Sequence, residues 1–92
     1  MHVILKRDSQ GRPIVQGVQH VIVRHSPTGF EWGYGGSGPA DLALNILCQC
    51  MPVSEALKHY QRFKWEVIAR IPFEGGVITD EDVEEFLKGM EE

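Results

Sequence analysis

The chain has 92 residues, of which 42% are hydrophobic and 24% charged, and its formal net charge is −4. A chain of this length is expected to form one domain, 1–92, with a core large enough to fold without a metal ion or a disulfide. No apolar run is long enough to span a membrane and the start is too short for a signal peptide, so we expect a cytoplasmic protein with no membrane contact.

The charge is unevenly distributed along the chain. Residues 1–73 carry eight Lys and Arg against five Asp and Glu, a net +3, whereas residues 74–92 carry one lysine against eight acids, a net −7. The acidic end argues against binding nucleic acid through bulk electrostatics, but it leaves a local basic face open elsewhere.

Residues 1–34 are predicted to form three or four short antiparallel strands. Short apolar runs alternate with Asp, Pro and Gly in the order that type I turns prefer. The strands are expected at residues 2–6, 12–16, 19–24 and 30–33, with turns at 8–11 and 26–29. In the last strand, Phe30, Trp32 and Tyr34 would lie on one face. Such a row is usually core, although exposed rings on a sheet can also stack on bases.

A glycine-rich segment follows, and the chain is expected to turn there from strand to helix. Four glycines fall within six positions: Gly33, Gly35, Gly36 and Gly38. Glycine permits backbone conformations and close contacts that other residues do not, which favours a sharp turn. Pro39 is typical of the first helical position, so Gly38 or Ser37 would be the N-cap. We expect the central helix at residues 38–51.

The central helix is expected to be apolar over most of its circumference. Between Ala40 and Met51 its polar residues are Asp41, Asn45 and Gln49, which recur every fourth position and form one narrow stripe. A helix this apolar is buried on more than one side, so we expect the sheet on one flank and the later helices on another. Asp41 would lie in the first turn, where a negative charge suits the helix dipole.

Two further helices complete the predicted fold. Apolar residues at helical spacing predict a second helix at 54–71 and an acidic C-terminal helix at 79–89 whose N-cap is Thr79, with a brief extended segment at Val77–Ile78 before it. The fold class is therefore α+β: a small three- to four-stranded antiparallel sheet followed by three helices packed against it.

The glycine-rich segment is the first candidate site. Backbone N–H groups at a helix start can bind an anion or a small ligand, here through Tyr34, Gly35, Gly36, Ser37 and Gly38. The P-loop and dinucleotide-binding patterns do not fit this segment. The alternative is a structural turn, in which the glycines let an aromatic strand pass directly into a packed helix.

The second helix is the second candidate. It would present Lys58, Arg62 and Trp65, which could bind a macromolecular partner. Trp65 lies at the margin of the apolar face and could instead be core. The spacing of the helix pair is that of a helix-turn-helix, which makes DNA binding a further hypothesis, although an ordinary αα-hairpin is far commoner.

No catalytic or metal-binding pattern is recognisable. Ser37 lacks a G-x-S-x-G context, the four histidines are scattered, and Cys48 and Cys50 point to opposite sides of a helix. We interpret both thiols as buried structural residues. We therefore expect no catalytic residue, no cofactor and no metal, and favour a non-enzymatic protein.

Two blocks of the sequence carry a resemblance. Residues 26–44 contain the run Trp-Gly-Tyr-Gly-Gly-Ser-Gly-Pro-Ala-Asp-Leu-Ala-Leu, and residues 60–72 form the second block. These blocks resemble a family of small bacterial and phage-borne proteins of unknown function. The resemblance implies a small stand-alone domain from phage-related genes, and it brings no activity, cofactor or catalytic residue with it.

The sequence alone does not determine a biochemical function. The leading hypothesis is a small binding module that acts through a protein partner. Small-ligand or anion binding at Gly35–Gly38 is the alternative, and DNA binding through the helix pair is the third. An exposed sheet edge could pair two copies, so we expect a monomer or a homodimer.

Overall fold

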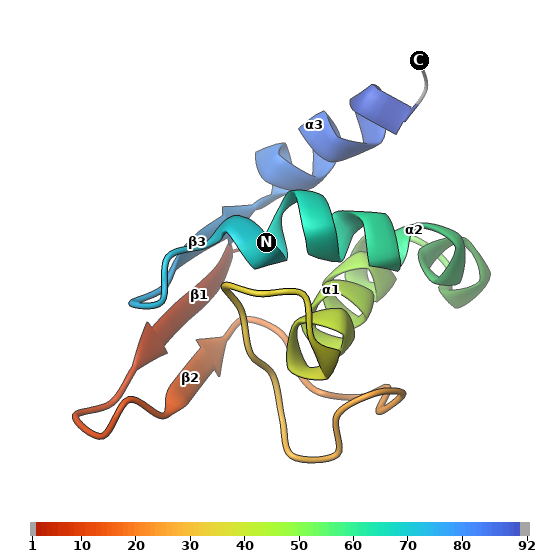
Figure 1. Ribbon diagram of the computed structural model, residues 1–92. Helices are drawn as coiled ribbons and strands as arrows, with labels where there is room; N and C mark the ends of the chain where they lie inside the picture. The colour runs from red at the N-terminus through yellow and green to blue at the C-terminus, as the bar shows by residue number, and fades with distance from the viewer. Residues whose placement is uncertain (1, 91–92) are drawn as a thin grey trace.

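The computed structural model describes residues 2–90 and has the predicted α+β architecture (Figure 1). The elements in chain order are β1 (His2–Arg7), β2 (Pro13–Gln16), α1 (Ser37–Cys50), α2 (Val53–Glu66), the 3-10 helix η1 (Ile68–Arg70), β3 (Gly76–Thr79) and α3 (Asp80–Met90). Met1 and residues 91–92 of the expected domain 1–92 lie outside the described residues. No helix within residues 2–90 is long and apolar enough to cross a lipid bilayer.

The sheet has β1 at its centre, between strands from opposite ends of the chain. Its order is β2-β1-β3, and both pairings are antiparallel. Val3 of β1 is the register partner of Ile78 of β3. Because side chains alternate along a strand, Val3, Leu5 and Ile78 are buried, whereas Ile4 and Val77 are exposed on the outer face. The sheet therefore contributes one apolar face to the core.

Two of the expected strands, 19–24 and 30–33, are not strands in the structure. Residues 17–29 form an irregular coil whose backbone bonds to side chains of α1 instead of to a neighbouring strand. Asn45 Oδ1 accepts the N–H groups of Val21 and Ile22 at 3.0 Å, and Asn45 Nδ2 donates to the carbonyl of Ile22 at 2.9 Å. The third strand is β3, which the sequence predicted only as a brief extended segment.

Helix α1 is the centre of the core, as its apolar composition predicted. It begins at Ser37, one residue before the expected 38–51 helix, with Gly36 as N-cap, and residues 38–47 are all buried. Helix α2 packs alongside it, and Val3 and Leu5 of the sheet belong to the same core cluster. Asp41 and Asn45 of the polar stripe are buried beneath the coil, whereas Gln49 is exposed and its Nε2 donates to the carbonyl of Gly17 at 3.2 Å.

The placement of Asp41 in the first turn of that helix was wrong. With the helix starting at Ser37, no acidic residue lies in the first turn, and Asp41 is instead fully buried beneath the coil. Its carboxylate satisfies backbone N–H groups of the coil, which is a different role from balancing a helix dipole.

Helix α2 is shorter than expected, whereas the bounds of helix α3 are close to those expected. Helix α2 ends at Glu66 and is followed by η1, whereas a single helix was expected over 54–71. Thr79 caps α3: its Oγ1 accepts the N–H of Asp82 at 3.3 Å, and Asp82 Oδ2 accepts the N–H of Thr79 at 2.8 Å. The rings of Phe63 and Phe86 meet edge to face, with centroids 4.9 Å apart, and join α3 to α2.

Candidate functional site

The structure brings the two predicted candidate surfaces together. The backbone of Gly35 lies directly against the indole of Trp65, so that a Cβ atom at position 35 would collide with the ring. Trp65 is 58% exposed and Tyr34 is 52% exposed, and both lie beside the bend at residues 33–36. We call Tyr34, Gly35, Gly36 and Trp65 the aromatic patch.

The bend is anchored by the residues before it, and this sets which rings are exposed. Gly33 has a φ of +87°, its N–H donates to the carbonyl of Ile68 at 3.0 Å, and a Cβ there would lie 3.1 Å from the carbonyl oxygen of Ile71. The buried Trp32 donates through Nε1 to the carbonyl of Pro72 at 3.0 Å. The chain bends at residues 33–36, and Tyr34 is exposed there.

The expected single face of three aromatic rings is therefore wrong. Phe30 and Trp32 are buried, whereas Tyr34 is exposed. The alternation of a strand would have kept the three rings together, but the positive φ of Gly33 breaks that alternation. The Tyr34 ring lies against the backbone of Gly36, where an added Cβ would meet it.

The glycines also allow a close approach at the start of α1. A Cβ at Gly38 would lie 2.8 Å from Cβ of Glu31, whose carboxylate binds the guanidinium of Arg7 at 2.8 and 3.2 Å. Ser37, the first residue of the helix, is exposed, and Gly36 makes no side-chain cap bond. The predicted ligand set of residues 34–38 is thus partly packed (Gly38) and partly open (Tyr34 and Ser37).

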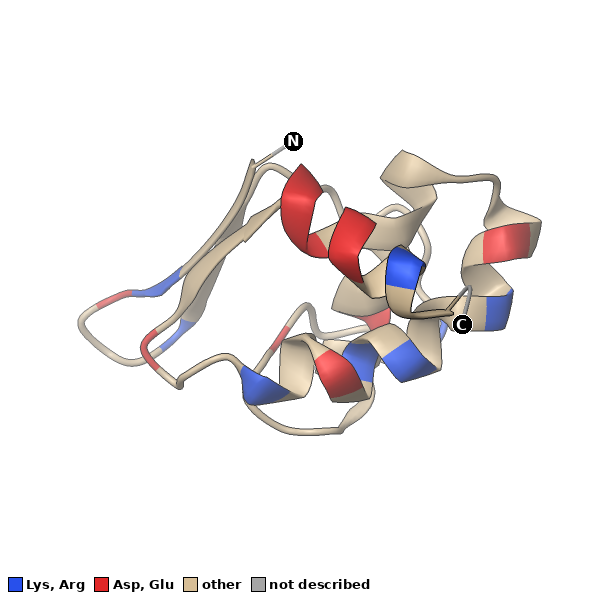
Figure 2. Cartoon of the chain, turned by 90° about the horizontal axis from the view of Figure 1, so that it is seen from above, with Lys and Arg blue, Asp and Glu red and all other residues tan. Residues whose placement is uncertain are grey.

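The basic residues predicted on α2 are paired within the helix. Lys58 Nζ lies 3.3 Å from Glu55 Oε1, and Arg62 forms an ion pair with Glu66. Figure 2 shows Lys and Arg interspersed with acidic residues along this helix. Lys64, which the sequence reasoning missed, places a cation beside the patch, with Nζ 4.6 Å from the Trp65 ring centroid. The position of Lys64 directly before Trp65 in the sequence could have indicated this contact.

A second site, which the sequence reasoning also missed, surrounds Asp41. Its carboxylate has an exposed fraction of 0% and accepts the N–H groups of His25 and Ser26, each at 2.9 Å, and that of Arg24 at 3.3 Å. His20 Nε2 lies 2.9 Å from Asp41 Oδ2. Burial alone would raise the pKa of Asp41, but the hydrogen bonds from Ser26, His20, His25 and Arg24 outweigh it and hold the pKa below its ordinary value.

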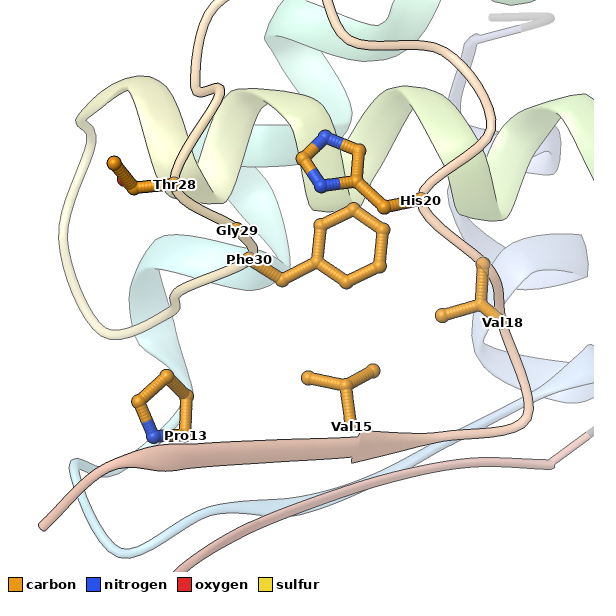
Figure 3. A pocket seen from close by; sticks show the side chains of 7 residues that line it. All are labelled: Pro13, Val15, Val18, His20, Thr28, Gly29 and Phe30. Atoms are coloured by element: carbon orange, nitrogen blue, oxygen red, sulfur yellow. The ribbon is translucent and has the colours of Figure 1, made fainter.

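His20 lines a pocket between β2 and the coil, shown in Figure 3. The pocket has a volume of about 310 Å³ and is lined by Pro13, Val15, Val18, His20, Thr28, Gly29 and Phe30. The imidazole of His20 packs on the ring of Phe30, with centroids 4.3 Å apart. The polar stripe of α1 was the sequence signal for the site around Asp41, because a buried carboxylate requires hydrogen-bond donors from elsewhere in the chain.

The cysteines and acidic residues that the structure describes do not assemble a metal site. Within residues 2–90 no group of three or more His, Cys, Asp and Glu side chains comes close enough to hold a metal ion. Cys48 is partly buried, contrary to full burial, and Cys50 is exposed; both are free thiols. Burial raises the pKa of the Cys48 thiol, and partial loss of hydration together with the negative charge of Asp80 raises the pKa of the Cys50 thiol, so both stay in the less reactive protonated form.

Comparison with known proteins assigns a family. Residues 3–89 match the family of unknown function DUF6166, and the chain belongs to that family. No curated protein and no solved structure matches the chain.

Proposed function

We propose that this member of DUF6166 is a small non-enzymatic binding module that captures a protein partner through the aromatic patch. One observation carries the proposal: the indole of Trp65 rests on the bare backbone of Gly35 while more than half of its surface stays exposed. Trp and Tyr are the side chains most enriched where protein interfaces concentrate their binding energy. Trp65 and Tyr34 would serve as anchors of such an interface.

The pre-set position of the indole supports this use. The ring is stacked on Gly35 on one side, and the Lys64 ammonium lies near it. A side chain already held in place loses little conformational freedom when a partner covers it, so more of the contact energy appears as affinity.

The pairing of charges supports a protein partner over nucleic acid. Binding to DNA requires cations free to replace the counterions of phosphates. Lys58 and Arg62 each have an acidic neighbour on the same helix. The predicted surface of Lys58, Arg62 and Trp65 therefore has one aromatic anchor, surrounded by positive and negative charges that nearly cancel. This arrangement is typical of contacts between proteins.

The proposal extends to location and origin. The exposed, unpaired thiol of Cys50 supports a cytoplasmic location, because free surface thiols are typical of reducing compartments. The resemblance of residues 26–44 supports a bacterial or phage-related origin. The module would act as a monomer or a homodimer before it meets its partner.

The test compares capture by the wild type with capture by Trp65→Ala, Tyr34→Ala and Val77→Ala. Val77 is the matched control, because it is 54% exposed but lies on the sheet. Tagged proteins are expressed in cells that encode the chain, partners are identified by quantitative mass spectrometry, and each partner is then purified and titrated calorimetrically. We expect Trp65→Ala to weaken binding by roughly tenfold or more and Val77→Ala to stay within about twofold.

Three results would contradict the proposal. A purified partner that binds Trp65→Ala and the wild type equally would place the interface elsewhere. Affinity that falls steeply with salt and requires a nucleic acid would favour the DNA hypothesis. A small anion retained by the native protein and lost in Gly36→Val would favour ligand binding at residues 34–38.

A further inference from the structure

We propose that the pocket lined by His20 binds a small neutral molecule with a compact apolar body and one hydroxyl or N–H group, which donates a hydrogen bond to Nδ1 of His20. This site is separate from the aromatic patch, and the inference does not depend on the proposed function. It rests on the tautomer of His20, the free ring nitrogen and the chemistry of the walls.

The contact with Asp41 fixes the tautomer of His20. Nε2 lies 2.9 Å from a carboxylate oxygen that is fully buried and also accepts the N–H of Ser26. A carboxylate that already has several N–H donors is ionised and can only accept, so Nε2 carries the proton. In the neutral imidazole, Nδ1 is then a hydrogen-bond acceptor.

Within the part of the chain that the structure describes, that acceptor has no partner. Among residues 2–90, His20 makes one hydrogen bond, to Asp41, and one ring contact, to Phe30. The two contacts hold the plane and the tilt of the imidazole, so Nδ1 is a fixed acceptor on a residue that lines the pocket. A fixed acceptor without a partner selects for a ligand that brings the donor.

The walls define the rest of the ligand. Figure 3 shows the imidazole of His20 above the ring of Phe30 and the side chain of Val15 on the opposite wall. Pro13 and Val18 add further apolar surface, Thr28 and Gly29 add uncharged polar surface, and the seven lining residues include no Lys, Arg, Asp or Glu. A charged ligand would lose its hydration without gaining an ionic partner there. The volume of about 310 Å³ is at the lower end of small-molecule sites and suits a single substituted ring.

The test uses three probes that share one body. 4-Methylphenol carries a donor, 4-methylanisole lacks it, and 4-methylbenzoate offers only acceptors and a charge. Each is titrated into the isotopically labelled chain, and the methyl resonances of Val15 and Val18 and the ring resonances of His20 are followed by NMR. We expect saturable shifts with 4-methylphenol, binding of 4-methylanisole weaker by about three- to tenfold, and 4-methylbenzoate weakest.

A pair of variants isolates Nδ1. In His20→Gln the side-chain N–H can still donate to Asp41, but nothing accepts at the position of Nδ1, so the preference for the phenol should disappear while the fold persists. His25→Gln is the matched control, because His25 bonds to Tyr60 outside the pocket, and it should keep the preference. If His20→Gln does not fold, Val15→Phe fills the pocket from β2 and should abolish the shifts.

The proposal fails under four outcomes. Equal affinity for the phenol and the anisole would mean that Nδ1 does not select the ligand. Tightest binding of the benzoate would mean that His20 donates a proton to the ligand. Shifts that persist in Val15→Phe, or no saturable shift with any probe, would mean that this pocket is not a binding site.

Discussion

Replacing Asp41 with asparagine tests whether a buried carboxylate holds the coil to α1. In the native protein, Asp41 Oδ2 accepts from Ser26 and His20, and Oδ1 accepts from His25. An asparagine that keeps Oδ1 puts an amide group where Oδ2 was, so two donors lose their acceptor. A hydrogen bond to a charged group contributes about 1.5–3 kcal/mol, so the loss should be about 3 kcal/mol at neutral pH. The total free energy of unfolding of a domain of this size is only about 5–15 kcal/mol.

The effect should depend on pH with a definite sign. The pKa of folded Asp41 lies below its ordinary value of 3.8, because its hydrogen bonds outweigh the effect of burial. The stability from the ionised carboxylate is therefore complete above the unfolded pKa and is lost as the pH falls through the lower, folded pKa. The difference between wild type and Asp41→Asn should be constant from pH 7 to about pH 5 and should shrink below about pH 4.

Urea denaturation followed by circular dichroism measures both quantities. At pH 7 the urea midpoint should fall by about 1–3 M, given the denaturant slope of small domains. Asp8→Asn is the control, since Asp8 also accepts two backbone N–H groups, from Gln10 and Arg12, but in an exposed turn. It should cost less than about 1 kcal/mol. If Asp41→Asn lowers the free energy of unfolding by less than about 1 kcal/mol, or if the difference from the wild type does not change down to pH 3, the ionised Asp41 carboxylate does not hold the coil to α1.

Three further predictions concern Gly35, Gly75 and Asn45. Gly35→Ala should displace the Trp65 indole, because the added Cβ collides with it, and should therefore reduce partner binding as much as Trp65→Ala does. The near-ultraviolet circular dichroism spectrum should change, and the free energy of unfolding should fall by less than about 1 kcal/mol. Gly75→Ala should lower the free energy of unfolding by about 2–4 kcal/mol, because a φ of +120° is strained for alanine and the added Cβ would meet the β1 backbone. Gly29→Ala is the control, since position 29 has a similar φ of +124° but open space around it, and it should cost only about 1 kcal/mol. Thermal melts measure both. Asn45→Ala should remove hydrogen-exchange protection at the amides that its side chain accepts while the amides paired within the sheet keep theirs; uniform loss would contradict a local role.

Local periodicity was sufficient to predict the helices but not the sheet. The largely apolar surface of α1 predicted its central position, and Thr79 predicted the start of α3 within a residue. The third strand depended on a pairing between Val3 and Ile78, which local pattern does not encode. The β-branched run at 21–23 has the composition of a strand, but side chains of α1 took its backbone hydrogen bonds.

The candidate sites were predictable as residues but not as arrangements. Trp65 and the glycine-rich segment were identified separately, and their contact follows from the packing of α2 beside α1, which no sequence spacing expresses. Asp41 was identified as polar in an apolar helix, yet the histidine that binds it lies 21 residues earlier. Long-range partners of a buried charge are set by the fold as a whole.

The central position of β1 has a consequence for synthesis of the chain. Its neighbour β2 follows within a few residues, but β3 begins only at Gly76. Contacts of such sequence separation slow folding, because most of the chain must be ordered before they form. Until residues 76–79 leave the ribosome, one edge of β1 has no partner strand, and an open edge is a template for pairing with another chain. A nascent or truncated chain that stops before residue 76 is therefore the form of this protein most prone to aggregate.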